Sequence, residues 1–221
     1  MTSQQSARPP GSGTGEKASE RSAPDAGGGS QQVARPLLDS TDINRSLMRI
    51  AHEIIERSED PENLYLVAVP NGGIPLARQL AANLAQVAGV DVPVGVLDTT
   101  LYRDDLISTG SRPALRTTEM PSAVDGCVVL LVDDVVKTGR TIRAAMDALM
   151  DFGRPRAVQV VGLVDRGHRE LPIKLDYVGK NVPTQVGEEV RLRSAGEGDS
   201  ERLEVVVLPP PPDPGAGEGS K

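Results

Sequence analysis

The chain has 221 residues, a formal net charge of -7 and a single cysteine. This length suits one domain plus tails, and one cysteine excludes a disulfide framework. The acidic balance excludes nucleic-acid binding driven by bulk charge, so any such binding needs a local basic patch. No apolar run is long enough for a signal peptide or a membrane span, and we therefore expect a cytoplasmic protein.

The two ends of the chain differ in composition from its middle. Residues 1–32 are rich in Ser, Gly, Ala and Pro and hold almost no large apolar side chains, which is typical of disorder. Residues 209–221 are again rich in Pro and Gly. We therefore predict a disordered N-terminal extension (1–32), one folded domain (33–208) and a disordered tail (209–221).

Between the tails, strands are predicted to alternate with helices. Ser40 or Thr41 can cap a helix that runs to about residue 57. The elements expected after it are a strand (64–69), a helix (74–88), strands at 92–97 and from 128, a helix (141–152), a strand (157–164) and a last edge strand (203–208). This alternation predicts an α/β fold with a doubly wound, mostly parallel sheet flanked by helices.

The strand that begins at residue 128 ends in the most informative segment of the chain. Five apolar residues precede Asp133 and Asp134, and two more apolar residues and a Lys-Thr-Gly turn follow before a helical pattern begins. In open α/β sheets, ligands bind beyond the carboxyl ends of the strands. A turn that opens a helix offers N–H groups to a phosphate, and ionised carboxylates suit sugar hydroxyls or a hard cation such as Mg²⁺. These chemistries together indicate a phosphorylated ribose.

The whole run resembles the phosphoribosyl-pyrophosphate (PRPP) signature of type I phosphoribosyltransferases. A Walker A loop is excluded, because the chain has no Gly-x-x-x-x-Gly-Lys-[Ser/Thr]. The residues that this resemblance assigns to PRPP are Asp133, Asp134, Val135, Val136, Lys137, Thr138, Gly139, Arg140 and Thr141, with Asp133 and Asp134 also catalytic. We call residues 135–141 the PRPP loop. Lys137 varies among related enzymes; it adds a phosphate contact or is a solvated side chain, and the two interpretations stay open.

Two further segments suit chemistry on a diphosphate. Asn71, Gly72 and Gly73 lie between a predicted strand and helix, where glycines let backbone N–H groups approach a diphosphate closely, although an ordinary turn would look the same. The stretch 102–121 is long and polar and begins with Tyr102 and Arg103. Such a segment inside a domain is either a lid that excludes water or a surface insertion.

The resemblance narrows at residues 164–172 and 176–183, which, with 49–53 and 99–106, look like the bacterial pyrimidine operon attenuation regulators, the PyrR family. It covers about residues 33–189. It implies that uracil and PRPP, with Mg²⁺ bound to the PRPP, give UMP and pyrophosphate. It also implies binding of a pyrimidine-operon mRNA hairpin under the control of UMP or UTP, and self-association into a homodimer or a higher homo-oligomer.

The PyrR resemblance also implies roles for particular residues. Asn71, Gly72 and Gly73 would bind pyrophosphate, while Tyr102 and the catalytic Arg103 would sit on the closing lid. The base pocket would be lined by Asp165, Tyr177 and Val178. The implied RNA-binding residues are Arg49, His52, Arg166 and Arg169.

The chain departs from the family pattern where pyrophosphate would bind. PyrR proteins usually have Thr-Arg-Gly where this chain has Asn71-Gly72-Gly73, and the missing arginine removes a bidentate phosphate partner. Two hypotheses therefore stand: a bifunctional uracil phosphoribosyltransferase and RNA regulator, or a nucleotide-sensing RNA-binding regulator with little turnover. A purine phosphoribosyltransferase is disfavoured by the match over residues 165–183.

Overall fold

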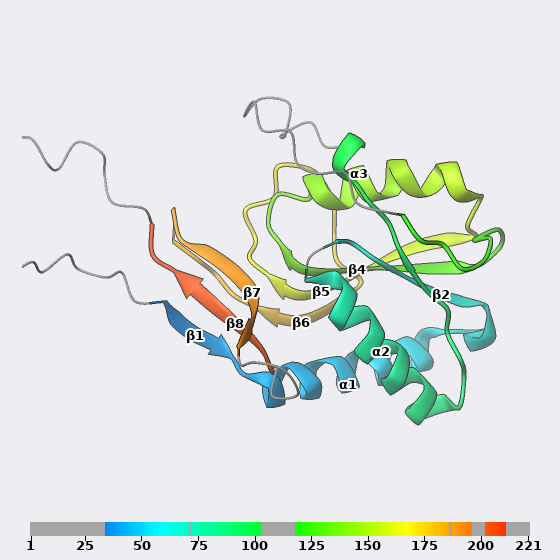
Figure 1. The fold of residues 1–221 in the computed structure, drawn as a ribbon, viewed down its shortest axis with the longest axis horizontal. Coiled ribbons are helices and arrows are strands. Elements are labelled where there is room, and N and C mark those ends of the chain that lie inside the picture. Colours follow the sequence, from blue (N-terminus) through cyan, green and yellow to red (C-terminus); the bar gives the residue numbers. More distant parts are fainter. Residues whose placement is uncertain (1–33, 71, 103–117, 186, 196–201, 211–221) are drawn as a thin grey trace, which may run out of the picture. The chain divides into compact units, whose positions relative to one another are not determined.

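The computed structural model describes residues 34–70, 72–102, 118–185, 187–195 and 202–210. Its centre is a five-stranded parallel sheet in the order β3-β2-β4-β5-β6. Two helices, α1 and α2, cover one face of this sheet and α3 covers the other (Figure 1). The predicted doubly wound, parallel α/β fold is confirmed.

The strands of the parallel sheet are β2 (Leu64–Ala68), β3 (Val94–Val96), β4 (Val128–Val136), β5 (Ala157–Asp165) and β6 (Tyr177–Asn181). The helices are α1 (Ser40–Arg57), α2 (Gly73–Ala88) and α3 (Arg140–Leu149), with 3-10 turns at Pro61–Asn63, Thr100–Tyr102 and Met150–Phe152. The predicted helix at 141–152 is therefore an α-helix that tightens into a 3-10 turn at its end.

A second, antiparallel sheet consists of β1 (Arg35–Leu38), β8 (Arg202–Leu208) and β7 (Glu189–Ala195), in that spatial order. The prediction of an edge strand at 203–208 is wrong, because β8 lies between β1 and β7 and pairs with both. Strands β1 and β7, and also β6 of the parallel sheet, were not predicted from the sequence. The parallel sheet therefore has a three-stranded neighbour, which lies beside the amino-terminal end of α1 (Figure 1).

The N-cap of α1 is Asp39, and neither Ser40 nor Thr41 has that role. The Asp39 carboxylate accepts a hydrogen bond from the Asp42 N–H at 2.8 Å, which satisfies one of the free donors at a helix start. Ser40 instead donates its hydroxyl to the carbonyl oxygen of Leu203, at 2.9 Å. The first turn of α1 is thereby tied to β8.

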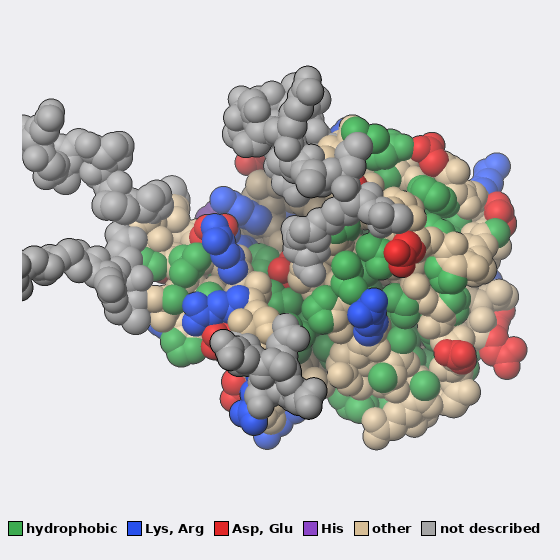
Figure 2. Space-filling model, in the orientation of Figure 1, with side chains coloured by type: hydrophobic (Ala, Val, Ile, Leu, Met, Phe, Trp, Pro, Cys, Tyr) green, Lys and Arg blue, Asp and Glu red, His purple; other side chains and the backbone are tan. Residues whose placement is uncertain are grey.

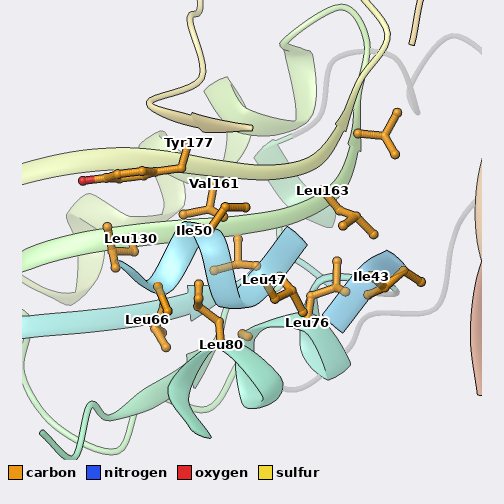
Figure 3. Close-up of a cluster of buried hydrophobic side chains, with 14 of the residues drawn as sticks. Ile43, Leu47, Ile50, Leu66, Leu76, Leu80, Leu130, Val161, Leu163 and Tyr177 are labelled. Carbon is orange, nitrogen blue, oxygen red and sulfur yellow. The ribbon is translucent and has the colours of Figure 1, made fainter. Parts of the chain in front are cut away.

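Apolar side chains fill both faces of the parallel sheet. Figure 3 shows Ile43, Leu47, Ile50, Leu76 and Leu80 of the helices packed against Leu66, Leu130, Val161 and Leu163 of the sheet. On the other face, Ile142 and Ala145 of α3 pack in a second cluster with Val129 and Leu131. Burial on both faces explains why these strands are continuous apolar runs, and it leaves polar chemistry to the strand ends.

The surface of the described residues mixes charges of both signs. On the face drawn in Figure 2, Lys and Arg side chains gather on the side of β7 and β8, with Asp and Glu side chains among them. Among the described residues, no helix combines the length and the apolar character that a bilayer crossing requires.

Candidate active site

Asp133 and Asp134 lie inside the last part of β4, which continues to Val136. Asp133 is buried, with 5% of its surface exposed, and Asp134 is half-buried. The Asp134 N–H donates to Asp133 Oδ1 at 3.0 Å, and the Val135 N–H donates to Asp134 Oδ1 at 2.9 Å. The backbone that follows each carboxylate therefore holds it in place at the carboxyl end of the sheet.

The PRPP loop surrounds a cavity of ≈ 300 Å³. The residues that line it are Asp133, Val135, Val136, Lys137, Thr138, Gly139, Thr141 and Ile142. Gly139 has a φ of 90°, a conformation that side chains rarely adopt, and it begins α3 without a side-chain cap. Within the described part of the chain, the N–H groups of Lys137, Thr138 and Gly139 donate to no protein acceptor. Free donors at a helix start form an anion site.

Gly72 and Gly73 approach the acidic pair from the end of β2. A Cβ atom on Gly73 would lie 2.5 Å from the carbonyl oxygen of Val132, and one on Gly72 would lie 2.1 Å from Asp134 Oδ2. Both positions therefore exclude a side chain in this arrangement. The arginine that the PyrR resemblance leads us to expect at position 72 would fit only if Asp134 moved. Asn71 lies outside the described residues.

A larger cavity, of ≈ 550 Å³, separates this edge from the antiparallel sheet. Its core side is formed by Gly72, Pro75 and Asp134, and its other side by Leu192, Arg193, Ser194 and Leu203 of β7 and β8. Sequence reasoning missed all four residues of the second group, because nothing in their local pattern indicates that β7 packs beside the end of β4. The site therefore has a wall that comes from a different sheet.

Burial raises the pKa of the Asp134 carboxyl above its ordinary value of 3.8. Hydrogen bonds from Asp133 and from backbone N–H groups oppose this shift and do not cancel it. Two adjacent acids in a half-buried site therefore favour any ligand that brings positive charge. Carboxylate oxygens are also the ligands that Mg²⁺ prefers.

Comparison with known proteins identifies the family. Residues 36–193 match the phosphoribosyl transferase domain. The chain is 55% identical over 172 residues to the bifunctional protein PyrR of Pelotomaculum thermopropionicum, which covers 78% of this chain and 94% of that protein. It is 56% identical over 168 residues to the bifunctional protein PyrR of Streptomyces coelicolor, which covers 76% and 86%. The chain belongs to the PyrR family.

Solved structures share the fold of this PyrR-family chain. The hypoxanthine phosphoribosyltransferase of Trypanosoma cruzi aligns with a TM-score of 0.59 and 22% identity, over 79% of this chain and 90% of that one. A hypoxanthine phosphoribosyltransferase of Staphylococcus aureus aligns with a TM-score of 0.55 and 19% identity, over 72% and 82%. At these identities the likeness is one of fold alone.

The base pocket that the PyrR resemblance implied is not assembled as expected. Tyr177 pairs with Val161 near the beginning of β6, is 2% exposed, and donates its hydroxyl to Gln159 at 3.2 Å. Asp165 stands at the other end of these strands, where it pairs with Asn181. The prediction that Tyr177 and Asp165 line one pocket is therefore wrong, because the sheet register separates them.

Val178 is likewise remote from the carboxyl end of β5, since it pairs with Gly162. The residues that do adjoin Asp165 are Asn181 and Val182, whose N–H donates to the Asp165 carbonyl at 2.8 Å. A signal for them was present in the sequence: they stand a few residues later in the same PyrR-like string. Both residues lie at the carboxyl end of the parallel sheet.

The PyrR resemblance implied four RNA-binding residues, and three of them make contacts within the chain. Arg49 donates to the carbonyls of Val178 and Gly179, both at 2.8 Å, and so ties α1 to β6. Arg166 is 6% exposed and donates to Thr184 Oγ1 and to the Glu188 carbonyl. Arg169 contacts the PRPP loop, as described below. His52 is exposed on α1.

The lid that the PyrR resemblance implied is described only at its start. The Tyr102 hydroxyl forms a hydrogen bond with Asp151, and the Tyr102 carbonyl accepts a hydrogen bond from Arg143 Nη2 at 2.9 Å. Residues 100–102 therefore rest on α3 and the turn after it. Arg103 lies outside the described residues, and its catalytic role stays a prediction.

Proposed function

We propose that the chain transfers the phosphoribosyl group of PRPP to uracil and so forms UMP. In this reaction N1 of uracil forms a bond to C1 of the ribose while the bond from C1 to the pyrophosphate oxygen breaks, and the N1 proton is released. The observation that carries the proposal is the acidic pair beside the free donors of the PRPP loop, in a chain that is 55% identical to a bifunctional protein PyrR.

Each part of the site has a place in this reaction. The carboxylates of Asp133 and Asp134 accept hydrogen bonds from the ribose hydroxyls, and their charge stabilises the oxocarbenium-like transition state. The N–H groups of the PRPP loop hold the 5′-phosphate, and those near Gly72 and Gly73 hold the pyrophosphate. Asp133 and Asp134 would hold Mg²⁺ that is bound to PRPP, because carboxylate oxygens are its preferred ligands, and the ion would supply positive charge to the leaving group.

The uracil reaction is tested by measuring UMP formation from uracil and PRPP with Mg²⁺. We expect UMP to form, and we expect an excess of hypoxanthine to leave the rate unchanged, because the resemblance that extends over residues 165–183 is to uracil-using PyrR proteins. Preferential consumption of hypoxanthine would contradict the assignment of the base. The matched control is the same assay without PRPP.

We also propose that the chain binds pyrimidine-operon mRNA and that UMP or UTP in the PRPP site changes the affinity for this RNA. Exposed His52 on α1 supports a contact surface there. We expect His52→Ala to weaken RNA binding by about tenfold, the effect of losing one good contact, while UMP binding stays unchanged. A gel-shift titration with Gln86→Ala of α2, another exposed residue, as the control measures this effect; equal affinity of the two variants would refute it.

A second candidate function is a nucleotide-sensing regulator with little turnover. The observation that favours it is the close approach of Gly72 to Asp134, which leaves no room for the arginine of other PyrR proteins. Binding calorimetry combined with the UMP-formation assay separates the two candidates. A regulator with little turnover would bind UMP or PRPP with saturation and yet form no UMP from uracil.

We further propose a cytoplasmic location and self-association into a homodimer or a larger homo-oligomer. The location is the expectation from the amino-acid sequence, and self-association comes from the resemblance to PyrR proteins. Light scattering after size-exclusion chromatography of the full chain tests the second point, and a monomer at all concentrations would contradict it.

A further inference from the structure

One segment, residues 165–173, begins at the last residue of β5 and binds the carbonyl groups of the PRPP loop. Arg169 Nη1 donates to the carbonyl oxygens of Lys137 at 2.7 Å and Val136 at 3.3 Å. The N–H groups of Glu170 and Leu171 both donate to the Thr138 carbonyl at 3.1 Å. Three consecutive carbonyls of the loop are therefore bound by one segment.

These carbonyl contacts determine where the N–H groups of the loop point. In a trans peptide, the C=O of one residue and the N–H of the next point in opposite directions. Fixing the carbonyls of residues 136–138 toward one side therefore turns the N–H groups of Lys137, Thr138 and Gly139 toward the other. All three residues line the cavity of the PRPP loop. The segment thus orients donors that it does not itself contact.

Arg169 is the side chain at the centre of this arrangement, and it is fixed in its own right. Its Nη2 forms an ion pair with Asp165 Oδ2 at 2.9 Å, and its Nε donates to the Ile173 carbonyl at 2.9 Å. The two charged side chains are 21% and 20% exposed. The second Asp165 oxygen accepts the Gly167 N–H at 2.9 Å. Every nitrogen of the guanidinium group therefore donates to a protein acceptor, and little donor capacity is left for an RNA phosphate.

We infer that Arg169 is a positioning residue for the 5′-phosphate of PRPP and UMP, and that Asp165 acts by holding Arg169. This inference rests on the proposed function, because it takes the PRPP loop as the phosphate site. It replaces the RNA-binding role of Arg169 and the base-binding role of Asp165 that the PyrR resemblance implied. A lysine cannot take this place, since an ammonium group lacks the planar fork that reaches two carbonyls and a carboxylate together.

The test compares Arg169→Met and Arg169→Lys with the unchanged chain, and uses Arg154→Met, an exposed arginine at the opposite end of the sheet, as the control. Calorimetric titration gives the affinity for UMP and for uridine, which lacks the phosphate, and thermal unfolding reports the fold. We expect both Arg169 variants to bind UMP about tenfold more weakly, the effect of losing charge-assisted contacts that orient the donors, and to bind uridine as before. Asp165→Asn is a milder second variant, for which we expect a smaller loss with the same selectivity for UMP.

The outcomes separate this inference from its alternatives. Unchanged UMP affinity in both Arg169 variants would overturn it, and a loss of RNA binding by the same variants in the gel-shift titration would then assign Arg169 to a direct RNA contact. A parallel loss of UMP and uridine affinity would also overturn it, because that pattern indicates a general defect of the fold. The readout is binding, so an unchanged chain that binds UMP but forms none from uracil would contradict the proposed reaction alone. An unchanged chain that does not bind UMP would contradict both.

Discussion

Asp134→Asn is expected to lower kcat for UMP formation by about 10²-fold or more, because a charge that stabilises the transition state in a half-buried site is lost. The same change is expected to raise the Tm of the ligand-free protein at neutral pH. Burial raises the pKa of this carboxyl, so the ionised form is less stable in the folded protein than in the unfolded chain. Asparagine keeps the shape of the side chain without that charge.

The raised pKa of Asp134 also determines how the stability of the protein changes with pH. Between the ordinary value of 3.8 and the raised folded-state pKa, the folded protein binds more protons at Asp134 than the unfolded chain does. The contribution of this group to stability therefore falls as the pH rises through that window and stays constant above it. Activity runs the opposite way, since catalysis needs the ionised form, and the acid limb of kcat/KM should lie above the ordinary aspartate range.

Asp147→Asn is the matched control for this prediction. It removes the same charge from an exposed ion pair with Arg143 on α3, and it should leave kcat unchanged and shift Tm little. Thermal unfolding over a series of pH values and steady-state kinetics on the same preparations measure both effects. A Tm of Asp134→Asn below that of the unchanged chain at neutral pH would show that the hydrogen bonds of the carboxylate outweigh the cost of burying its charge.

Gly73→Ala is expected to destabilise the protein by about 2 kcal/mol, the range found when atoms are forced into a packed interior. The added Cβ would lie 2.5 Å from the Val132 carbonyl oxygen, which is backbone of the central strand and also accepts the Val69 N–H at 2.9 Å. The start of α2 must then move away from β4. The pyrophosphate subsite moves with it, so the KM for PRPP should rise together with the loss of stability.

Urea unfolding measures the stability change, and Gly89→Asn provides the control. Gly89 ends the same helix in a left-handed conformation with φ of 70°, and a Cβ there meets nothing within 4 Å. Asparagine tolerates that conformation, so the midpoint should change little. Equal urea midpoints for Gly73→Ala and the unchanged chain would mean that α2 has room to shift. The close approach of Gly73 to the Val132 carbonyl would then not limit the side chain at position 73.

The amino-acid sequence by itself determined four strands of the parallel sheet (β2, β3, β4 and β5), the two longest helices and the acidic pair with its loop. These features are local: β2, β4 and β5 are continuous apolar runs because both their faces are buried, and α1 shows its apolar stripe at Ile43, Leu47, Ile50 and Ile54. The PRPP signature could be recognised for the same reason, since strand, acids and turn are contiguous in the chain.

Only the tertiary structure decided which distant residues share the site. Strand register placed Asn181, and not Tyr177, beside Asp165, and register depends on pairing between strands that no local pattern encodes. The antiparallel sheet brought Leu192 and Leu203 to the cavity opposite Asp134. The PyrR resemblance implied that Arg169 contacts RNA. In the folded chain Arg169 instead donates hydrogen bonds to carbonyl groups that are 32 and 33 residues away in the sequence. Such contacts exist only after folding, because an arginine binds the acceptors that the fold places around it.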